Sequence, residues 1–245
     1  MKIALIGYGK MGQEIAQLAK DNKKFEIVSV SFDDAKSGLD KDGIKKADVA
    51  IDFTSPEIIL SNISEIANLG VNMVIGTTGW YDKISEVKKI VASKEIGLIY
   101  GQNFSIGANM FFDIVKYASG LIAKFEGYDV FGVETHHAAK KDSPSGTARK
   151  ISDIILKNYP SKKVLQTNAL DRPIRKEELH FASVRGGRNF GRHEIAFDSH
   201  ADEIRLIHQA WGRRGFAEGA LVAAGFIKEK KGLYDFSDIF DELSE

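Results

Sequence analysis

The chain has 245 residues, and its content of 43% hydrophobic and 28% charged residues is that of an ordinary folded protein. Basic and acidic residues number 34 each, so no net charge draws the chain to nucleic acid or to an anionic membrane. The absence of cysteine excludes disulfides, thiolate metal sites and cysteine nucleophiles.

The first part of the chain alternates short β-branched runs with amphipathic stretches of helical period. Strands are expected over residues 2–6, 26–31, 48–53, 71–75 and 97–100. Helices are expected between them over residues 11–20, 56–69 and 82–93. Nearly all-apolar strands that alternate with helices form parallel sheets covered on both faces. This part therefore predicts an α/β fold with a Rossmann-type, doubly wound parallel sheet.

The pattern changes after residue 105. A long apolar helix is expected over 106–125, a strand over 128–135, a helix over 144–156, and strands over 179–185, 193–197 and 203–210. A last helix over 216–228 has an apolar face that could pack on the first domain. We predict a dinucleotide-binding domain of residues 1–104 plus 215–245. Residues 105–214 then form a smaller α+β domain for substrate binding and oligomerisation.

The sequence GYGKMG follows the first expected strand directly and opens the first helix. In this setting the first glycine makes a tight turn, the second lets the backbone approach a pyrophosphate, and the third permits close helix packing. The amides at the helix start then face the phosphates. The predicted cofactor contacts are Gly7, Tyr8, Gly9, Lys10, Met11 and Gly12. A tight turn without a ligand is the alternative.

Asp33 lies about 20 residues after Gly12, where an acidic residue receives the ribose hydroxyls of NAD. No arginine is nearby to meet the 2′-phosphate of NADP, so we expect NADH to be favoured over NADPH. Alternatively, Asp33 and Asp34 start a solvated turn. Two loops that follow later strands are predicted to contact the nicotinamide, although their residues also suit ordinary turns. These residues are Gly76, Thr77, Thr78, Gly101, Gln102, Asn103 and Phe104.

A polar segment joins the strand over 128–135 to the helix over 144–156. Asp142 or Ser143 can cap this helix, and Pro144 suits its first position. The amides of Ser145, Gly146 and Thr147 then lack partners inside the helix. Such a helix start binds a carboxylate well.

Two histidines and a lysine lie just ahead of that helix start. His136 and His137 supply a proton donor near neutral pH, and Lys140 supplies a fixed positive charge. The alternative is an ordinary capped helix with surface histidines. We expect no metal, because adjacent histidines on a strand point to opposite faces and no third ligand lies at a recognised spacing.

All nine arginines lie at residue 149 or later, so the second half of the chain differs chemically from the first. Because arginine grips carboxylates and phosphates through two hydrogen bonds, this half suits a multiply anionic small molecule. Ordinary surface arginine is the alternative. The apolar run at residues 3–6 is too short for a signal peptide, and we expect a cytoplasmic protein.

Several further motifs accompany GYGKMG in a fixed order. They are DFT at 52–54, GTTG at 76–79, QNFSIG at 102–107, ETHHAAKKDSPSGTA at 134–148, SVRGGRNFGRH at 183–193 and FAEGA at 216–220. Together they resemble the dihydrodipicolinate reductase family over nearly the whole chain. The pattern HHxxKxDxPSGT is specific to that family, whereas the glycine motif alone is not.

The resemblance implies that the chain uses NAD(P)H to reduce the dipicolinate precursor formed from pyruvate and aspartate semialdehyde, a step of lysine and diaminopimelate biosynthesis. In the family pattern His136 acts as acid and base and Lys140 as proton donor. The dicarboxylate substrate is held by His137 and the helix start at Ser145, Gly146 and Thr147, with Arg185 as a further partner for its charge. The family is commonly a homotetramer.

Two other classes of function share parts of this pattern. Another NAD-dependent dehydrogenase or imine reductase would have the glycine motif and the loops but act on a different substrate. A non-catalytic dinucleotide sensor would bind NADH without turnover, and replacing His136 or Lys140 would not change its behaviour.

Overall fold

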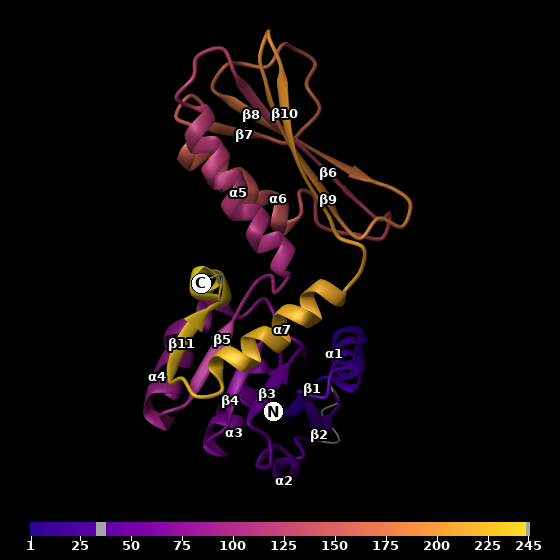
Figure 1. The fold of residues 1–245 in the computed structure, drawn as a ribbon, viewed down its shortest axis with the longest axis vertical. Coiled ribbons are helices and arrows are strands. Elements are labelled where there is room, and N and C mark those ends of the chain that lie inside the picture. Colours follow the sequence, from indigo (N-terminus) through magenta and orange to yellow (C-terminus); the bar gives the residue numbers. More distant parts are fainter. Residues whose placement is uncertain (33–37, 244–245) are drawn as a thin grey trace. The chain divides into compact units, whose positions relative to one another are not determined.

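The computed structural model of the protein describes residues 1–32 and 38–243, with side chains as far as residue 240 (Figure 1). The chain divides into two compact units. The first unit comprises Met1–Ile106 and Arg213–Glu245, and the second comprises Gly107–Gly212. The boundaries expected from the sequence lie two residues from these at each junction.

The first unit contains a six-stranded sheet in which every neighbouring pair of strands is parallel. Its strands are β1 (Lys2–Ile6), β2 (Glu26–Ser31), β3 (Val49–Asp52), β4 (Asn72–Ile75), β5 (Gly97–Tyr100) and β11 (Gly232–Asp235), in the order β11-β5-β4-β3-β1-β2. This confirms the predicted Rossmann-type fold. The strand order reverses between β1 and β3, and ligands of such sheets bind beyond the carboxyl ends of the strands at that point.

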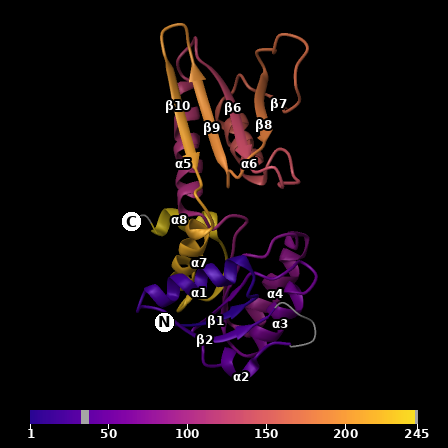
Figure 2. The ribbon, with the colours of Figure 1, turned by 90° about the vertical axis from the view of Figure 1, so that its right-hand side faces the viewer.

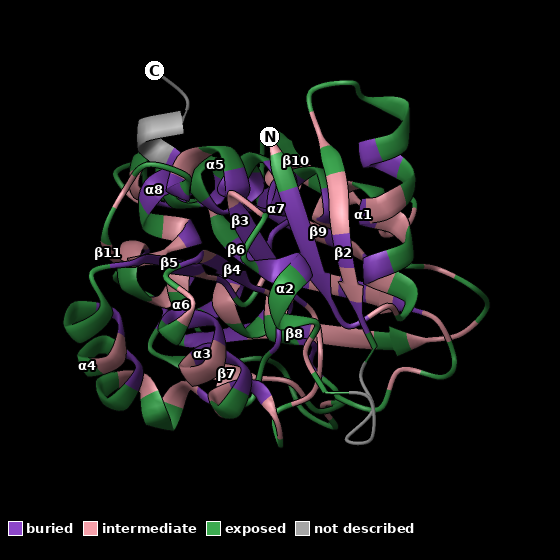
Figure 3. Ribbon diagram, turned by 90° about the horizontal axis from the view of Figure 1, so that it is seen from below, coloured by how far each residue is buried: buried purple, intermediate pink, exposed green. Residues whose placement is uncertain are grey.

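Helices cover both faces of this sheet because the strand residues alternate between two cores. Ile3 and Leu5 of β1 join one core with α1 (Lys10–Asp21) and α7 (Arg214–Ile227). Ala4 and Ile6 join the other core with the helices on the opposite face. Those helices are α2 (Lys41–Ile44), α3 (Ile59–Asn68) and α4 (Ile84–Lys94). Figure 3 shows β1 buried along most of its length.

The end of the chain completes this unit. The predicted last helix is α7, and it packs on β3, β4 and β5 as expected. A Cβ atom on Gly219 would lie 1.7 Å from the carbonyl oxygen of Phe104, so α7 touches the loop after β5 through its backbone. β11 and α8 (Phe236–Leu243) were not predicted. The four residues of β11 are half-buried at the sheet edge and carry no strong strand signal.

The second unit contains a five-stranded mixed sheet with two helices on one face (Figure 2). Its strands are β6 (Asp129–His136), β7 (Val164–Gln166), β8 (Glu178–Arg185), β9 (Arg192–Asp198) and β10 (Glu203–Gln209), in the order β10-β9-β6-β8-β7. β6 lies between parallel β8 and antiparallel β9. The helices are α5 (Ile106–Ile122) and α6 (Gly146–Asn158), and the smaller α+β unit is confirmed.

Three details of this unit differ from the prediction. The short strand β7 was not expected, α5 ends at Ile122 rather than at residue 125, and α6 begins at Gly146 rather than at Pro144. Within the described part of the chain, no helix has the length and apolar character needed to cross a membrane.

Candidate active site

A cleft of about 340 Å³ lies at the carboxyl ends of β1, β3 and β4 in the first unit. It is lined by Gly9, Lys10, Met11, Phe53, Thr54, Gly76, Thr77 and Thr78. The cleft therefore brings the centre of the glycine motif together with the predicted loop after β4. It occupies the position where a doubly wound sheet binds a dinucleotide.

Each of the three positions in the motif is occupied by glycine for a different geometric reason. Gly7 has a φ of +86°, and a Cβ atom there would lie 2.5 Å from the carbonyl oxygen of Phe53. A Cβ on Gly12 would lie 2.2 Å from the carbonyl oxygen of Gly7, whereas one on Gly9 would meet nothing within 4 Å. Gly9 caps α1 without a side-chain hydrogen bond to its amides. Open space in front of a helix start fits a pyrophosphate.

Asp52 ties together the two loops that line this cleft. Its side chain is fully buried and accepts hydrogen bonds from the amide and hydroxyl of Thr54, the hydroxyl of Thr77 and the amide group of Asn62. Burial raises the pKa of this carboxyl group. Asp52 had no predicted role beyond its place in the DFT motif, and the structure shows that it fixes the loops after β3 and β4.

The other described residues that were predicted to contact the cofactor do not line this cleft. Phe104 is buried, with its ring centroid 6.2 Å from that of Phe53. A Cβ atom on Gly101 would lie 3.0 Å from Cβ of Phe236, so this glycine packs tightly, whereas Gln102 is exposed and Asn103 is half-buried. Tyr8 lines a second cleft, of about 570 Å³, beside α1 and β2. Asp33 lies outside the described residues.

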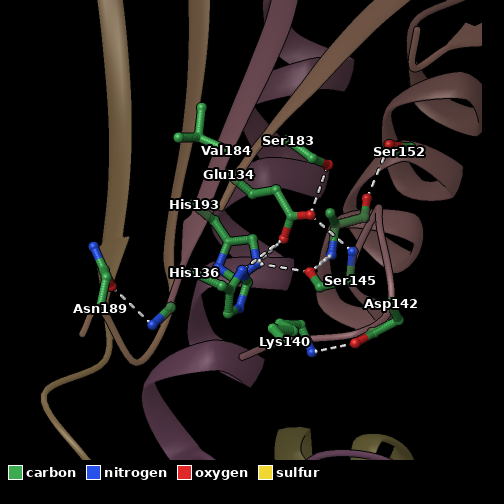
Figure 4. Close-up of polar contacts among 12 residues, drawn as sticks. Glu134, His136, Lys140, Asp142, Ser145, Ser152, Ser183, Val184, Asn189 and His193 are labelled. Atoms are coloured by element: carbon green, nitrogen blue, oxygen red, sulfur yellow. Dashed lines mark hydrogen bonds and ion pairs between the residues drawn. The ribbon is translucent and has the colours of Figure 1, made fainter. Parts of the chain in front are cut away.

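In the second unit, alternation along β6 places two polar side chains on its helix-facing side. Glu134 and His136 are two residues apart, so both point toward the face that α5 and α6 cover. His193 of β9 lies directly opposite Glu134, and Ser183 and Arg185 of β8 lie opposite Glu134 and His136. Figure 4 shows Glu134, His136 and His193 pointing toward one another beside Ser145.

The carboxylate of Glu134 is the centre of this cluster. Its exposed fraction is 0%, and those of His136 and His193 are 6% and 3%. Oε2 lies 2.9 Å from Nδ1 of His136 and 3.6 Å from Nε2 of His193. Burial alone would raise the pKa of Glu134, but the surrounding donors hold it well below its usual range. Glu134 is therefore ionised throughout the neutral range, and its negative charge faces the His136 ring.

Lys140 is held by an ion pair at the start of the segment before α6. Its Nζ lies 2.8 Å from Oδ1 of Asp142 (Figure 4). Burial opposes this pair, but the Lys140 ammonium outweighs it and lowers the pKa of Asp142. The guanidinium of Arg185 donates to the backbone carbonyl of Asp142 and to Oε1 of Glu134. Arg185 therefore holds the segment in place, and its expected contact with a substrate anion stays a prediction.

The predicted cap of α6 was wrong. Ser145, not Asp142 or Ser143, is the N-cap, and its hydroxyl accepts from the amide of Ala148 at 3.1 Å. The amide of Ser145 donates to Oε1 of Glu134 at 2.8 Å, and its hydroxyl lies 3.2 Å from Nε2 of His193. Glu134 and His193 are distant from Ser145 in the sequence, so local cap preferences could not show that Ser145 is the cap.

The predicted substrate residues gather around this helix start. Gly146 is exposed at the first position of α6, and Thr147 is half-buried beside it. The backbone amide of His137 donates to the carbonyl of Asn189 at 2.7 Å, which fixes the segment after β6 against the loop before β9. The structure thus places His137, Gly146 and Thr147 on the segment that also carries His136 and Lys140.

Glu134, His136 and His193 carry ligand atoms within 4.8 Å of one another and belong to residue types that bind metals. The charge of Glu134 is already paired with Arg185, and its Oε1 accepts from Ser145 and Ser183. We assign no metal to this cluster. The sequence did not single out Glu134 or His193, and it proposed Asp142 only as a helix cap. The spacing of Glu134 and His136 is the signal that could have paired them.

Comparison with known proteins agrees with this geometry. Sequence profiles described as the N-terminus and the C-terminus of dihydrodipicolinate reductase match residues 1–104 and 107–240. The chain belongs to the dihydrodipicolinate reductase family. The predicted resemblance is therefore confirmed.

Two curated members of the family, both named 4-hydroxy-tetrahydrodipicolinate reductase, are similar over nearly the full chain. The protein of Christiangramia forsetii is 36% identical over 99% of both chains. That of Caldanaerobacter subterraneus is 37% identical over 94% of both chains.

Among solved structures, a dipicolinate-bound dihydrodipicolinate reductase from Paenisporosarcina sp. TG-14 is 26% identical, with a TM-score of 0.76 over 98% of this chain and 99% of that one. An amine dehydrogenase from Mycobacterium smegmatis has a TM-score of 0.60 at 11% identity, over 97% of this chain and 95% of that one. The second likeness shows the shared fold alone.

Proposed function

We propose that this chain is the NAD(P)H-dependent reductase that converts 4-hydroxy-tetrahydrodipicolinate to tetrahydrodipicolinate in lysine and diaminopimelate biosynthesis. The observation that carries the proposal is the placement of His136 and Lys140 beside the start of α6, in a chain that belongs to this family. The first unit is the dinucleotide-binding domain, and the second unit is the substrate-binding domain.

The second unit offers two kinds of partner for a planar dicarboxylate. The positive end of the α6 dipole lies at Ser145, Gly146 and Thr147, and Lys140 adds a full charge, while the Ser145 amide itself donates to Glu134. The 4-hydroxyl group of the substrate has to leave as water, and the dinucleotide, when bound, would supply a hydride to the conjugated ring that remains. The negative charge that develops on the ring is then protonated, for which His136 serves as acid and base and Lys140 as proton donor. His137 helps to hold the substrate carboxylates.

We infer that NADH is the preferred cofactor. The sequence carries Asp33 at the position that favours ribose hydroxyls and holds no arginine before residue 149. An acidic residue repels the 2′-phosphate of NADPH. Without a nearby arginine, only lysines such as Lys10 could pair with that phosphate. The cytoplasmic location stays a prediction of the sequence.

The oxidation of reduced nicotinamide tests this function. Purified protein is mixed with substrate made in situ from pyruvate and aspartate semialdehyde, with NADH and NADPH in parallel and a working reductase as control. We expect rapid protein-dependent loss of the nicotinamide absorbance, faster with NADH. Turnover of other imines, hydroxy acids or amino acids without turnover of this substrate would indicate another dehydrogenase or imine reductase. Binding of NADH without any turnover would indicate a sensor.

We also propose that the second unit assembles the chain into a homotetramer. An apolar stripe on and just after α5 is exposed, formed by Met110, Ile114, Tyr117, Leu121 and Phe125. Val184 and Ile207 are exposed on the face of the sheet that α5 and α6 leave uncovered. Such patches are typical of subunit interfaces. We expect light scattering to give the mass of four chains, reduced in Ile207→Asp. The mass of a single chain in the wild type would contradict this assembly.

A further inference from the structure

Glu134 joins the histidine that exchanges protons to the helix that holds the substrate. Its Oε2 faces the His136 ring, and its Oε1 accepts from the Ser145 amide at the start of α6 (Figure 4). No role in the reaction follows from either contact alone. Taken together, they place one buried carboxylate between the two parts of the substrate site.

We propose that Glu134 is a positioning residue of the reductase, which fixes the His136 ring and the start of α6 relative to each other. The inference rests on the proposed function, because it assigns Glu134 to the same reaction. Glu134 is fully buried and does not reach the substrate, so it acts through His136 and Ser145.

The contact with His136 determines which ring nitrogen exchanges a proton. Nδ1 of His136 lies 2.9 Å from Oε2 of Glu134 without hydrogen-bond geometry, and the negative charge of the carboxylate favours a hydrogen on this nitrogen. Nε2 is then the nitrogen left to exchange a proton with the substrate. A Cβ atom on Gly191 would lie 2.8 Å from this Nε2, so the glycine leaves room at that side of the ring.

The contacts of Oε1 fix the helix start. The amide of Ser145 donates to Oε1 at 2.8 Å, and the hydroxyl of the same residue caps α6 through Ala148. Arg185 donates to Oε1 and to the carbonyl of Asp142, the partner of Lys140. A shift of the Glu134 carboxylate would therefore displace the cap and the Lys140 segment together.

The charged groups that face His136 determine in which direction the pH profile of a Glu134 variant should move. Glu134 is the negative group at 2.9 Å on the same strand, and Arg185 faces the ring from β8. His193 faces it from β9 at a centroid distance of 5.2 Å, and Lys140, paired with Asp142, faces it from the segment before α6. Burial lowers the pKa of His193, which favours its neutral form. Removing the charge of Glu134 leaves the ring facing Arg185 and Lys140 without a negative neighbour on its own strand.

The test compares Glu134→Gln with a matched control, Glu178→Gln. Glu178 is also a buried carboxylate of the second unit, paired with Arg172 and remote from His136. We expect Glu134→Gln to lower kcat on the order of 10- to 100-fold, with the dissociation constant of NADH unchanged. The high-pH limb of its kcat profile should move to lower pH. Glu178→Gln should keep the wild-type profile.

A double-mutant cycle separates positioning from general loss of structure. In a His136→Ala background, Glu134→Gln should lower kcat by a smaller factor than in the wild type, because the ring that it orients is gone and only its hold on the start of α6 remains. The same loss in both backgrounds, or an unchanged pH profile in Glu134→Gln, would overturn the proposal.

The state of the His136 ring can also be read without turnover. In ¹⁵N-histidine NMR spectra at pH 8, the wild type and Glu178→Gln should show hydrogen on Nδ1 of His136, and Glu134→Gln should show a mixture of the two tautomers. An unchanged tautomer in Glu134→Gln would overturn the proposal even if the enzyme is active. Conversely, a wild type that fails to reduce the substrate would overturn the proposed function, while these spectra still report whether Glu134 fixes the ring.

Discussion

His136→Ala is expected to lower kcat by about 10²- to 10³-fold, the usual contribution of a general acid or base. The ring of His136 is buried in the second unit, and its Nδ1 lies 2.9 Å from Oε2 of Glu134. Alanine leaves no group there to exchange a proton with the substrate. NADH contacts are proposed in the first unit, so the dissociation constant of NADH should stay within about twofold of the wild type.

A matched control for this variant is His200→Ala, since His200 is exposed in the turn between β9 and β10. That variant should keep the wild-type kcat. Steady-state rates and NADH fluorescence titrations of both variants make the comparison. A wild-type kcat in His136→Ala would remove His136 from the reaction, and a parallel loss of NADH binding would indicate a folding defect instead.

Lys140→Ala is expected to lose both turnover and substrate affinity. Its ammonium group, with 23% of the side chain exposed, is held 2.8 Å from Asp142 at the segment that leads to α6. A charged hydrogen bond to a buried carboxylate contributes about 1.5–3 kcal/mol, so KM should rise by about 10- to 100-fold. The loss of the proposed proton donor should lower kcat by about 10²-fold as well.

The neighbouring Lys141→Ala is the control, because Lys141 is exposed one residue farther along the same segment. Inhibition by dipicolinate, the dicarboxylate bound in the related Paenisporosarcina enzyme, gives a second measure of carboxylate affinity. We expect weaker inhibition in Lys140→Ala and unchanged inhibition in Lys141→Ala. Equal inhibition of the two variants by dipicolinate would mean that Lys140 contributes only general surface charge and no specific contact with the substrate.

The sequence predicted those parts of the fold that are governed by local patterns. Buried β-branched runs marked β1 to β5, and the glycine motif predicted the turn in which Gly7 has a φ of +86°. β11 was missed because its position depends on pairing with β5, far away in the sequence. Tertiary contacts of this kind leave little trace in a run of four half-buried residues.

The candidate site shows the same limit at the level of side chains. His136 and Lys140 were predicted because their motif is local. Their supports come from other segments, since the register of β9 brings His193 to Glu134. The cap of α6 was misplaced for the same reason, because Glu134 binds the Ser145 amide across the fold. A local motif shows which reactive side chains are present, whereas the strand register determines which of them come into contact.

Isotope transfer tests the central claim most directly. The purified chain would be supplied with NADH carrying two deuterium atoms at C4 and with substrate made in situ, and the product would be analysed by mass spectrometry. If this chain reduces 4-hydroxy-tetrahydrodipicolinate, the tetrahydrodipicolinate formed carries one deuterium atom per NADH consumed. Product without deuterium, or no protein-dependent product beside a working reductase, would contradict the assignment.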